Sequence, residues 1–283
     1  RPYLDRMMFR ILSHVLFGID PDSDDFKKLE LLSQTLDLVS VQRHTDKSVF
    51  QPKLVAFLEF LQNVCRKQRA SKKKSKPMFK SVLVLLVETN QDALQDRNVF
   101  CNLINDFWSG RIDSAGLLTW TIKFLSDNPN WHDLFLNSEK NTDFSIKSNN
   151  IVKEVLRLSQ SEWLLRQTTA PIHFQDFHIP ENWNVRICVR EAHRSPEIFK
   201  CPASFDPTRF ESEKFTPSVY SPFGLHKHKC VGWQISHAAV TGLIYNLSKE
   251  FHFSKVDDGP ISHLWMHWAP NRRLKIKVLR QQD

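Results

Sequence analysis

The chain has 283 residues, 41% of them hydrophobic, so it is long enough to bury the core of one large domain or two ordinary ones. Its net charge of +8 permits anionic partners but does not by itself indicate nucleic-acid binding. Five cysteines without a CxxC spacing exclude a disulfide scaffold and a zinc ribbon, and they indicate a reduced, intracellular protein. The longest apolar run, 82–87, is far below the roughly 18 residues that a membrane span requires.

Residues 1 to about 165 are predicted to be mostly helical. Apolar positions recur at helical spacing over 3–19, 25–40 and 51–68. A run at 66–77 collects seven basic residues with Ser and Pro. It is interpreted as a solvated linker, with an anionic docking patch as the alternative.

The longest helical candidate covers 95–126, and its apolar residues surround much of the circumference, which predicts a buried central helix. Gly110 and Gly116 interrupt it at about 1 kcal/mol each relative to alanine, so a close approach to the backbone is expected there. A further helix over 149–160 places Glu154 and Arg157 three positions apart on one face. Taken alone, this spacing indicates an exposed ion pair.

After residue 165 the chain changes to short extended runs separated by turns. The segments 171–180 and 183–190 are rich in β-branched or alternating residues and predict strands of a small sheet. Residues 233–251 form the last amphipathic helix, and Cys230 stands just before it. The N-terminus of a helix favours negative charge, which shifts such a thiol toward the thiolate.

Three chemistries could use this thiolate. It could be a nucleophile with His226 or His228 as its base, or it could join both histidines in a zinc site. It could also be the single axial ligand of a haem iron, with nearby cations for the haem propionates.

The segment "PFGLHKHKCVG", 222–232, resembles the cysteine-ligand loop of the cytochrome P450 family. The matching positions are Phe223, Gly224, His228, Cys230 and Gly232. Further signatures of the family follow in the expected order: the Glu-x-x-Arg of Glu154 and Arg157, then Arg166, then Arg209 within "FDPTRF". Joint agreement of these separate motifs by chance is improbable.

The resemblance implies a mainly α fold with a small β portion, a cytochrome P450-like fold that is N-terminally incomplete. Residues 1–283 would then be a single haem domain, the C-terminal two-thirds of the family fold. A membrane anchor would belong to the missing portion. The implied location is intracellular, either cytoplasmic or on the cytosolic face of a membrane.

The resemblance also assigns roles to individual residues. Cys230 would bind the iron of heme b as a thiolate, and Arg166 and His228 would hydrogen-bond the haem propionates. Phe223 would shield the sulfur, and Gly232 would complete the cofactor-binding loop. A buried structural network, in place of the exposed ion pair, would be formed by Glu154, Arg157 and Arg209.

Two departures from the family pattern affect the expected chemistry. His226 replaces a glycine that the family usually has four positions before the cysteine. In "SGRIDSAGLLTW", 109–120, an ungapped alignment puts Ile112 at the usual acid position and Asp113 at the usual threonine. A one-residue helical bulge would move Asp113 and Ser114 into the acid and alcohol roles. The catalytic candidates are therefore Gly110, Asp113 and Ser114.

The implied activity is a monooxygenase reaction on a small organic substrate, with O2 and with electrons from NAD(P)H. A ferredoxin-like or flavin-containing donor would deliver them, and Lys227 and Lys229 beside Cys230 could attract an acidic one. No nucleic acid is expected. Because the acid and threonine pair is altered, a haem-thiolate isomerase or lyase and a peroxide-using enzyme are alternatives. A non-catalytic haem-binding or scaffold protein is a further alternative.

Overall fold

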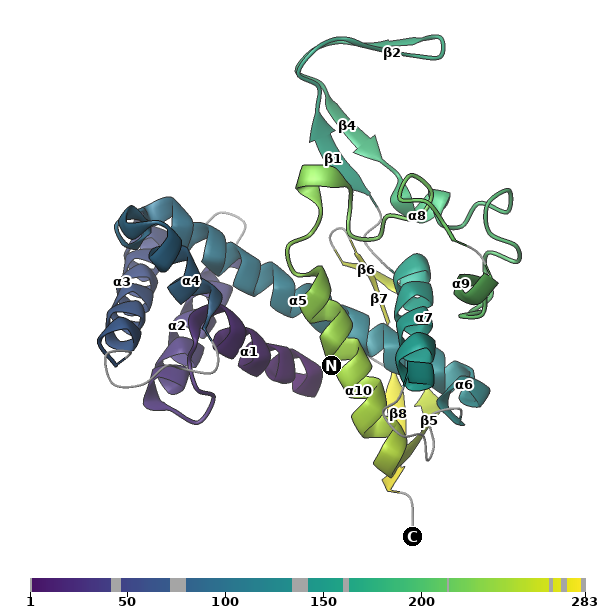
Figure 1. Ribbon diagram of the computed structural model, residues 1–283, viewed down its shortest axis with the longest axis horizontal. Helices are drawn as coiled ribbons and strands as arrows, with labels where there is room; N and C mark the ends of the chain where they lie inside the picture. Colours follow the sequence, from purple (N-terminus) through teal and green to yellow (C-terminus); the bar gives the residue numbers. More distant parts are fainter. Residues whose placement is uncertain are drawn as a thin grey trace. The chain divides into compact units, whose positions relative to one another are not determined.

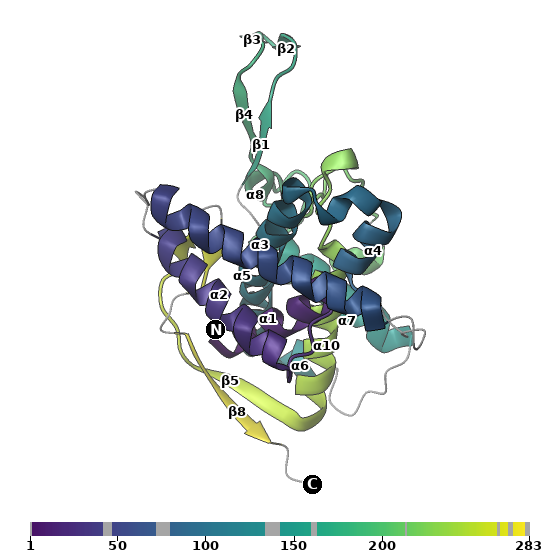
Figure 2. The same cartoon turned by 90° about the vertical axis from the view of Figure 1, so that its left-hand side faces the viewer.

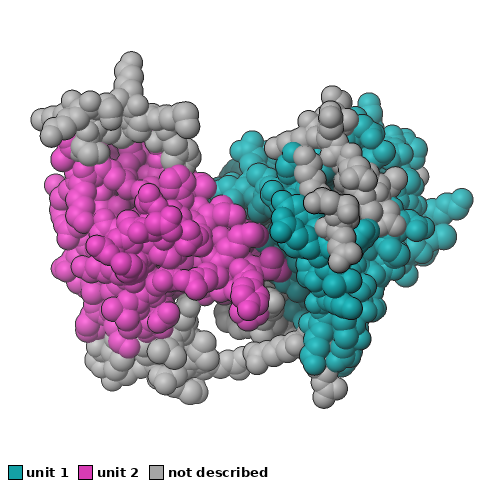
Figure 3. Space-filling model, turned by 90° about the horizontal axis from the view of Figure 1, so that it is seen from below, with its two compact units in different colours: residues 1, 116–283 teal, residues 2–115 magenta. Residues whose placement is uncertain are grey.

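The computed structural model describes residues 2–41, 47–71, 80–133, 142–159, 163–212, 214–264, 267–270 and 274–280. The chain divides into two compact units, coloured in Figure 3. Unit 2 is Pro2–Ala115, and unit 1 is Gly116–Asp283 together with Arg1. The boundary falls inside one long helix. The single haem domain expected over 1–283 stays a prediction.

Helices are the only regular secondary structure among the described residues of unit 2 (Figure 1). Its elements are α1 (Pro2–Phe17), α2 (Asp24–Val41), α3 (Lys47–Ser71), α4 (Val82–Thr89), the 3-10 helix η1 (Gln91–Leu94) and the start of α5 (Arg97–Asp127). The helices predicted over 3–19, 25–40, 51–68 and 95–126 are confirmed within a few residues. Helix α1 ends at Phe17, and the next residue, Gly18, has a φ of +67°, the left-handed conformation that glycine adopts without steric penalty.

The core of unit 2 is largely aromatic. The Phe9 ring lies 5.5 Å from that of Phe26 and 5.0 Å from that of Phe107, and both contacts are edge-to-face. Phe17 adds a third ring at 5.1 Å from Phe107. These contacts join α1, α2 and α5 at spacings that favour aromatic pairs.

The linker predicted at 66–77 is wrong in its first part, because α3 continues through Ser71. Arg, Lys, Gln and Ala are good helix formers, so charge alone does not end a helix. In addition, the Gln68 side-chain amide donates to the carbonyl oxygens of Phe17 at 2.8 Å and Gly18 at 2.9 Å. Residues 72–77 lie outside the described residues.

Unit 1 combines helices with four antiparallel two-stranded ladders among its described residues. Its helices are the rest of α5, α6 (Pro129–Asp133), α7 (Thr142–Ser159), α8 (Val189–Ala192), α9 (Arg209–Ser212), the 3-10 helix η2 (His226–His228) and α10 (Trp233–Glu250). Its strands are β1 (Leu164–Gln167), β2 (Ile172–Phe174), β3 (Phe177–Ile179), β4 (Asn184–Ile187), β5 (Phe251–Asp257), β6 (Ser262–Leu264), β7 (His267–Ala269) and β8 (Lys275–Arg280).

The expected strands are confirmed in outline. The segment 171–180 forms the hairpin β2–β3, and 183–190 supplies β4 before turning helical at Val189. Strand β4 pairs with β1, so Arg166 lies opposite Val185. The ladders β5–β8 and β6–β7 complete the β portion. No helix among the described residues is long and apolar enough to cross a bilayer.

The C-terminal half of α5 packs inside unit 1. Trp120 stacks on Phe124 at 5.4 Å, and Phe124 stacks on Phe205 at 5.0 Å. The Trp120 indole N–H also donates to the carbonyl of Trp268 at 2.8 Å. This stack anchors the segment before α9, which carries one arginine of the candidate site.

Candidate functional site

The loop that precedes α10, residues 221–232, is held by hydrogen bonds of its own backbone; we call it the Cys230 loop. The N–H of Gly224 donates to the carbonyl of Ser221 at 3.0 Å, and the N–H of Cys230 donates to that of Phe223 at 2.8 Å. Cys230 is exposed. A β-carbon on Gly232 would lie 3.8 Å from the Cys230 Sγ, so this glycine is next to the sulfur. The loop therefore presents a thiol just before the first turn of α10.

His226, at the position where the family usually has a glycine, adopts a backbone conformation that favours glycine. Its φ is +53°, in the left-handed region that favours glycine, and Gly224 two residues earlier has a φ of +75°. A residue with a β-carbon is strained there by roughly 1–2 kcal/mol. The loop thus adopts a glycine-type turn at His226 in spite of the substitution.

Three consecutive basic residues of the Cys230 loop, Lys227, His228 and Lys229, are exposed. The Lys229 ammonium lies 4.0 Å from the centre of the Trp233 ring, a cation–π contact that ties it to α10. Arg166 lies in the β1–β4 ladder, which Figures 1 and 2 show leading outward to the β2–β3 hairpin. Its Nη1 donates to the carbonyl of the neighbouring Leu165 at 2.7 Å. The basic side chains next to the thiol in sequence are therefore those of the Cys230 loop itself.

Phe223 and His237 connect the Cys230 loop to α10. Their ring centres lie 5.7 Å apart, and His237 also makes an edge contact with Trp233 at 5.9 Å. Burial, and then the charges of Lys153 and Lys229, lower the pKa of His237. This histidine is therefore a neutral packing partner of the loop near pH 7.

Glu154, Arg157 and Arg209 meet in the interior of unit 1; we call them the Glu154 cluster. The Arg157 Nε and Nη2 donate to the two carboxylate oxygens of Glu154, each at 2.8 Å. The Arg209 Nε donates to Glu154 Oε1 at 3.2 Å, and the backbone N–H of Asp206 donates to the same oxygen at 2.9 Å. Glu154 and Arg157 are fully buried.

The remaining guanidinium N–H groups of the Glu154 cluster bind backbone carbonyls. Arg157 donates to the carbonyls of His193 and Pro202, both at 2.8 Å, and to that of Ser204 at 3.1 Å. Helix α7, which carries Glu154 and Arg157, runs close to α8 and α9 (Figure 1). The cluster thus ties α7 to the chain that leads into the Cys230 loop.

The three catalytic candidates lie on the part of α5 that belongs to unit 2. Asp113 is exposed, Ser114 is buried, and a β-carbon on Gly110 would lie 3.4 Å from a methyl group of Leu12. At Gly116 the added atom would meet nothing within 4 Å, so the expected close approach is present only at Gly110. The structure shows α-helix over all of Arg97–Asp127, without the bulge that the relay hypothesis required.

On this regular helix, Ile112 is 40% exposed and lies beside the exposed Asp113. The helix therefore has no bulge that would shift the register, and the ungapped alignment, with Ile112 at the usual acid position, stays a prediction. The roles of Asp113, Ser114 and Gly110 stay predictions. Those three residues belong to unit 2, whereas Cys230, Arg166 and the Glu154 cluster belong to unit 1.

The zinc-site hypothesis is wrong. Among the described residues, no three His, Cys, Asp or Glu side chains converge on a metal position, and His226, His228 and Cys230 are all described. A metal held by Cys230 would therefore not be bound by three converging protein ligands in this loop.

Sequence reasoning missed His193, which is completely buried next to the Glu154 cluster. An isolated histidine in an irregular segment carries no periodicity or spacing signal. Its partners lie 28 and 36 positions away, so only the folded chain reveals them.

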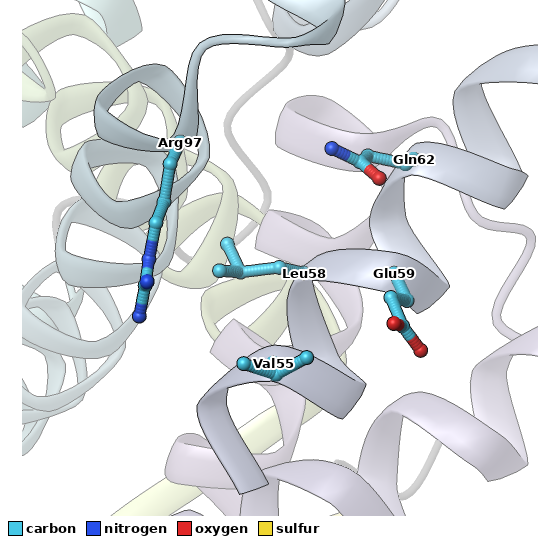
Figure 4. Close-up of a pocket in the computed structure, with 5 residues that line it drawn as sticks. All are labelled: Val55, Leu58, Glu59, Gln62 and Arg97. Carbon is cyan, nitrogen blue, oxygen red and sulfur yellow. The ribbon is translucent and has the colours of Figure 1, made fainter. Parts of the chain in front are cut away.

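Unit 2 contains a pocket of about 200 Å³ between α3 and the start of α5. Its lining, drawn in Figure 4, is Val55, Leu58, Glu59, Gln62 and Arg97. The Arg97 side chain extends along the pocket and donates to the Gln51 side-chain oxygen at 2.8 Å. With no thiol, hydroxyl or imidazole in its lining, this pocket does not hold a cysteine or serine nucleophile or a histidine base.

Comparison with known proteins identifies the class of the fold. The retinoic acid-bound cyanobacterial CYP120A1 covers 99% of this chain with a TM-score of 0.76 at 19% identity, and the chain covers 68% of it. A crystal structure of another cytochrome P450, CYP102L1, gives a TM-score of 0.79 at 16% identity over 99% of this chain and 71% of that one. The fold is that of the cytochromes P450.

The sequence leads to the same family. A family model described as Cytochrome P450 matches residues 148–278. Abscisic acid 8'-hydroxylase 2 of Arabidopsis thaliana is 24% identical, over 98% of this chain and 61% of the relative. Abscisic acid 8'-hydroxylase 1 of Oryza sativa subsp. japonica is 27% identical over 58% of this chain and 38% of the relative. The chain is thus similar in sequence to the cytochromes P450 over 148–278 and to these two relatives, and it spans 61% or less of the relatives' length.

This family implies a haem bound through a cysteine thiolate, and the residues of the Cys230 loop fit that group. The loop offers one exposed sulfur, no converging second ligand set among the described residues, and a small residue, Gly232, beside the sulfur. The exposed ammonium groups of Lys227 and Lys229 complement two carboxylates, and the exposed His228 imidazole can donate a hydrogen bond. The donor set therefore suits a single axial thiolate and a pair of propionates.

Proposed function

We propose that the protein is a haem-thiolate monooxygenase that hydroxylates or otherwise oxidises a small organic substrate. The observation that carries this proposal is the exposed Cys230 thiol, presented before α10 in a loop with three adjacent basic residues. When bound, the haem supplies oxygen activation, and the electron donation of its thiolate ligand favours O–O cleavage.

Each residue around the thiol has a definite task in this proposal. The N-terminus of α10 favours the thiolate form of Cys230. Arg166 and His228 bind the propionates through charge-assisted hydrogen bonds, and Phe223 covers the sulfur side of the loop. The Glu154 cluster does not touch the cofactor but holds the chain that leads into the loop.

Proton delivery is proposed for Asp113 at the position that the ungapped alignment gives it, without a helical bulge, because its carboxylate is exposed and can exchange protons with water. Ser114 is buried on the regular α5 helix and can accept or donate only within the protein. Asp113→Asn removes the titratable proton while it keeps the size of the side chain. A lower rate of O2-dependent product formation supports the relay, and an unchanged rate excludes it.

A second candidate function is favoured by Ile112, an apolar side chain at the position where the family usually has an acid. A haem-thiolate isomerase or lyase, or a peroxide-using enzyme, does not need protons delivered to bound O2. Turnover without NAD(P)H and O2 would establish this second function. A strict requirement for both would exclude it.

The substrate class is proposed from the relatives. Two relatives are named abscisic acid 8'-hydroxylases, and one structural neighbour was solved with retinoic acid bound. We propose an apolar organic acid as the substrate class, with abscisic acid and retinoic acid as the first compounds to test. A spectral shift of the haem on addition of either acid, with a saturable dependence on concentration, would support this class.

The electron donor is proposed to be a ferredoxin-like or flavin-containing protein with an acidic docking face. Lys227 and Lys229 are exposed within the Cys230 loop and supply complementary charge. Replacing both with glutamate is expected to slow reduction by such a donor and to leave reduction by dithionite unchanged.

The test of the ligand assignment is the spectrum of the reduced, CO-bound protein after reconstitution with haem. A strongly red-shifted Soret band is expected for the unmodified chain and for Cys188→Ser and Cys201→Ser, matched controls whose cysteines are also exposed. Cys230→Ser is expected to lose the shift. Retention of the shift by Cys230→Ser would overturn the assignment, and its absence from the unmodified chain would overturn the proposed function.

A further inference from the structure

His193 lies between the Glu154 cluster and the Cys230 loop and contacts both. We propose that His193 is a positioning residue that fixes the first peptide of the Cys230 loop to the buried Glu154 cluster. The proposal rests on the proposed function for its importance to haem binding, but its structural content concerns the chain alone.

The backbone and the side chain of His193 bind different partners. Its backbone carbonyl accepts the Arg157 Nη1–H at 2.8 Å. Its imidazole Nε2 accepts the backbone N–H of Ser221 at 3.2 Å. Since the Ser221 carbonyl accepts the N–H of Gly224 at 3.0 Å, the imidazole holds the residue from which the first turn of the loop starts.

The imidazole ring is itself held in place. It stacks on Tyr220 with ring centres 5.1 Å apart and the planes inclined by 27°, and the edge contact with Phe199 spans 6.1 Å. The Tyr220 hydroxyl donates to the carbonyl of Lys153 in α7 at 2.8 Å. The acceptor nitrogen therefore has little freedom to move away from Ser221.

The charge state of the His193 imidazole agrees with its role as acceptor of the Ser221 N–H. Nε2 can accept the Ser221 N–H only when the ring is neutral and carries its proton on Nδ1. Burial, followed by the charge of Arg157, lowers the pKa of His193 to about 4. The ring is neutral near pH 7.

Packing alone does not account for a histidine here. Nδ1 is buried and has no hydrogen-bond partner in the described part of the chain. A phenylalanine would stack on Tyr220 equally well without burying this polar group, which is unfavourable when unsatisfied. The interaction that a phenylalanine could not supply is the one with Ser221.

The test compares amide hydrogen exchange in the haem-free protein for the unmodified chain, His193→Phe and His193→Gln. His193→Phe keeps the stacking and removes the acceptor, so exchange at Ser221 should accelerate roughly ten-fold. His193→Gln offers an amide oxygen and should restore most of the protection. Phe199→Leu perturbs the same aromatic group without touching the acceptor, and it should leave Ser221 protected relative to its neighbours.

Unchanged exchange at Ser221 in a folded His193→Phe variant would overturn the proposal. If that variant does not fold, NMR of the unmodified protein decides. A scalar coupling between the Ser221 amide nitrogen and His193 Nε2, with Nε2 unprotonated, supports the proposal, and a protonated Nε2 overturns it.

The failure of this inference can be told apart from the failure of the proposed function. If the unmodified protein shows no thiolate-type haem spectrum, the proposed function fails, whereas the exchange and NMR results still decide the role of His193. If the spectrum is present, His193→Phe should release haem to apomyoglobin several-fold faster than His193→Gln. Equal release rates would show that the contact does not position the cofactor.

Discussion

The Glu154 cluster and the Cys230 loop lie in the same unit and are both rich in charged side chains, yet their polar groups are satisfied in opposite ways. In the cluster, a buried carboxylate and two arginines pair with one another and with backbone carbonyls. In the loop, the thiol and three basic side chains are exposed. The cluster is thus paired within the interior of the chain, whereas the side chains that we propose to serve a cofactor lie at the surface.

Breaking the cluster should have the largest effect on stability. Arg157→Ala leaves Glu154 buried with only Arg209 and one backbone N–H, so the free energy of unfolding should fall by about 3–5 kcal/mol. Urea denaturation followed by circular dichroism measures it. Arg10→Ala is the control, because the Arg10–Asp22 pair is exposed and its loss should change stability by less than about 1 kcal/mol. Similar losses of unfolding free energy in Arg157→Ala and Arg10→Ala would show that the buried cluster stabilises the chain no more than an exposed ion pair does.

Lowering the pH should reduce the free energy of unfolding, because His193 is buried as a neutral ring beside the Glu154 cluster. Its pKa is about 4 in the folded protein against 6.5 ordinarily, so the unfolded chain binds the proton more readily between these values. The contribution of neutral His193 to the free energy of unfolding is complete above pH 6.5. It is lost as the pH falls toward 4, by about 3 kcal/mol in total. Urea midpoints measured across this range should decline less steeply in His193→Phe. If the urea midpoints of the two proteins decline in parallel, His193 is not a source of the pH dependence.

Relieving strain in the Cys230 loop should have a smaller effect, with the opposite sign. His226→Gly places a glycine at a φ of +53° and should raise the free energy of unfolding by about 1 kcal/mol. His228→Gly, in the same loop but without a positive φ, is the control and should bring no gain. Thermal unfolding of the two variants measures the difference, and equal melting temperatures would show that the loop relaxes around His226.

The smallest effect on stability is expected at the thiol itself. Cys230 is exposed, so Cys230→Ser in the haem-free protein should change the free energy of unfolding by no more than about 0.5 kcal/mol. Cys65 is buried, and Cys65→Ser should be destabilising by about 1 kcal/mol or more, because a more polar hydroxyl would be removed from water. Urea midpoints distinguish the two variants. A large loss at Cys230 would mean that the thiol supports the fold.

The same contrast explains what could be predicted from sequence. Helix periodicity is local, so the long helix at 95–126 and the shared face of Glu154 and Arg157 follow from spacing alone. Burial of that pair is not local: Arg209 lies 55 positions from Glu154, and only the family motif connected them. The helical continuation through 66–71 and the contact of His193 with Ser221 depend on partners that no spacing reveals.

Glu154 and Arg157 leave the ribosome well before the groups that satisfy them. The carbonyl of Pro202 follows Arg157 by 45 positions, and Arg209 follows Glu154 by 55. Until those residues emerge, burying α7 would leave guanidinium N–H groups without acceptors. We therefore expect α7 to remain accessible to water and to chaperones during synthesis, and unit 1 to close only after Arg209 has been added to the chain.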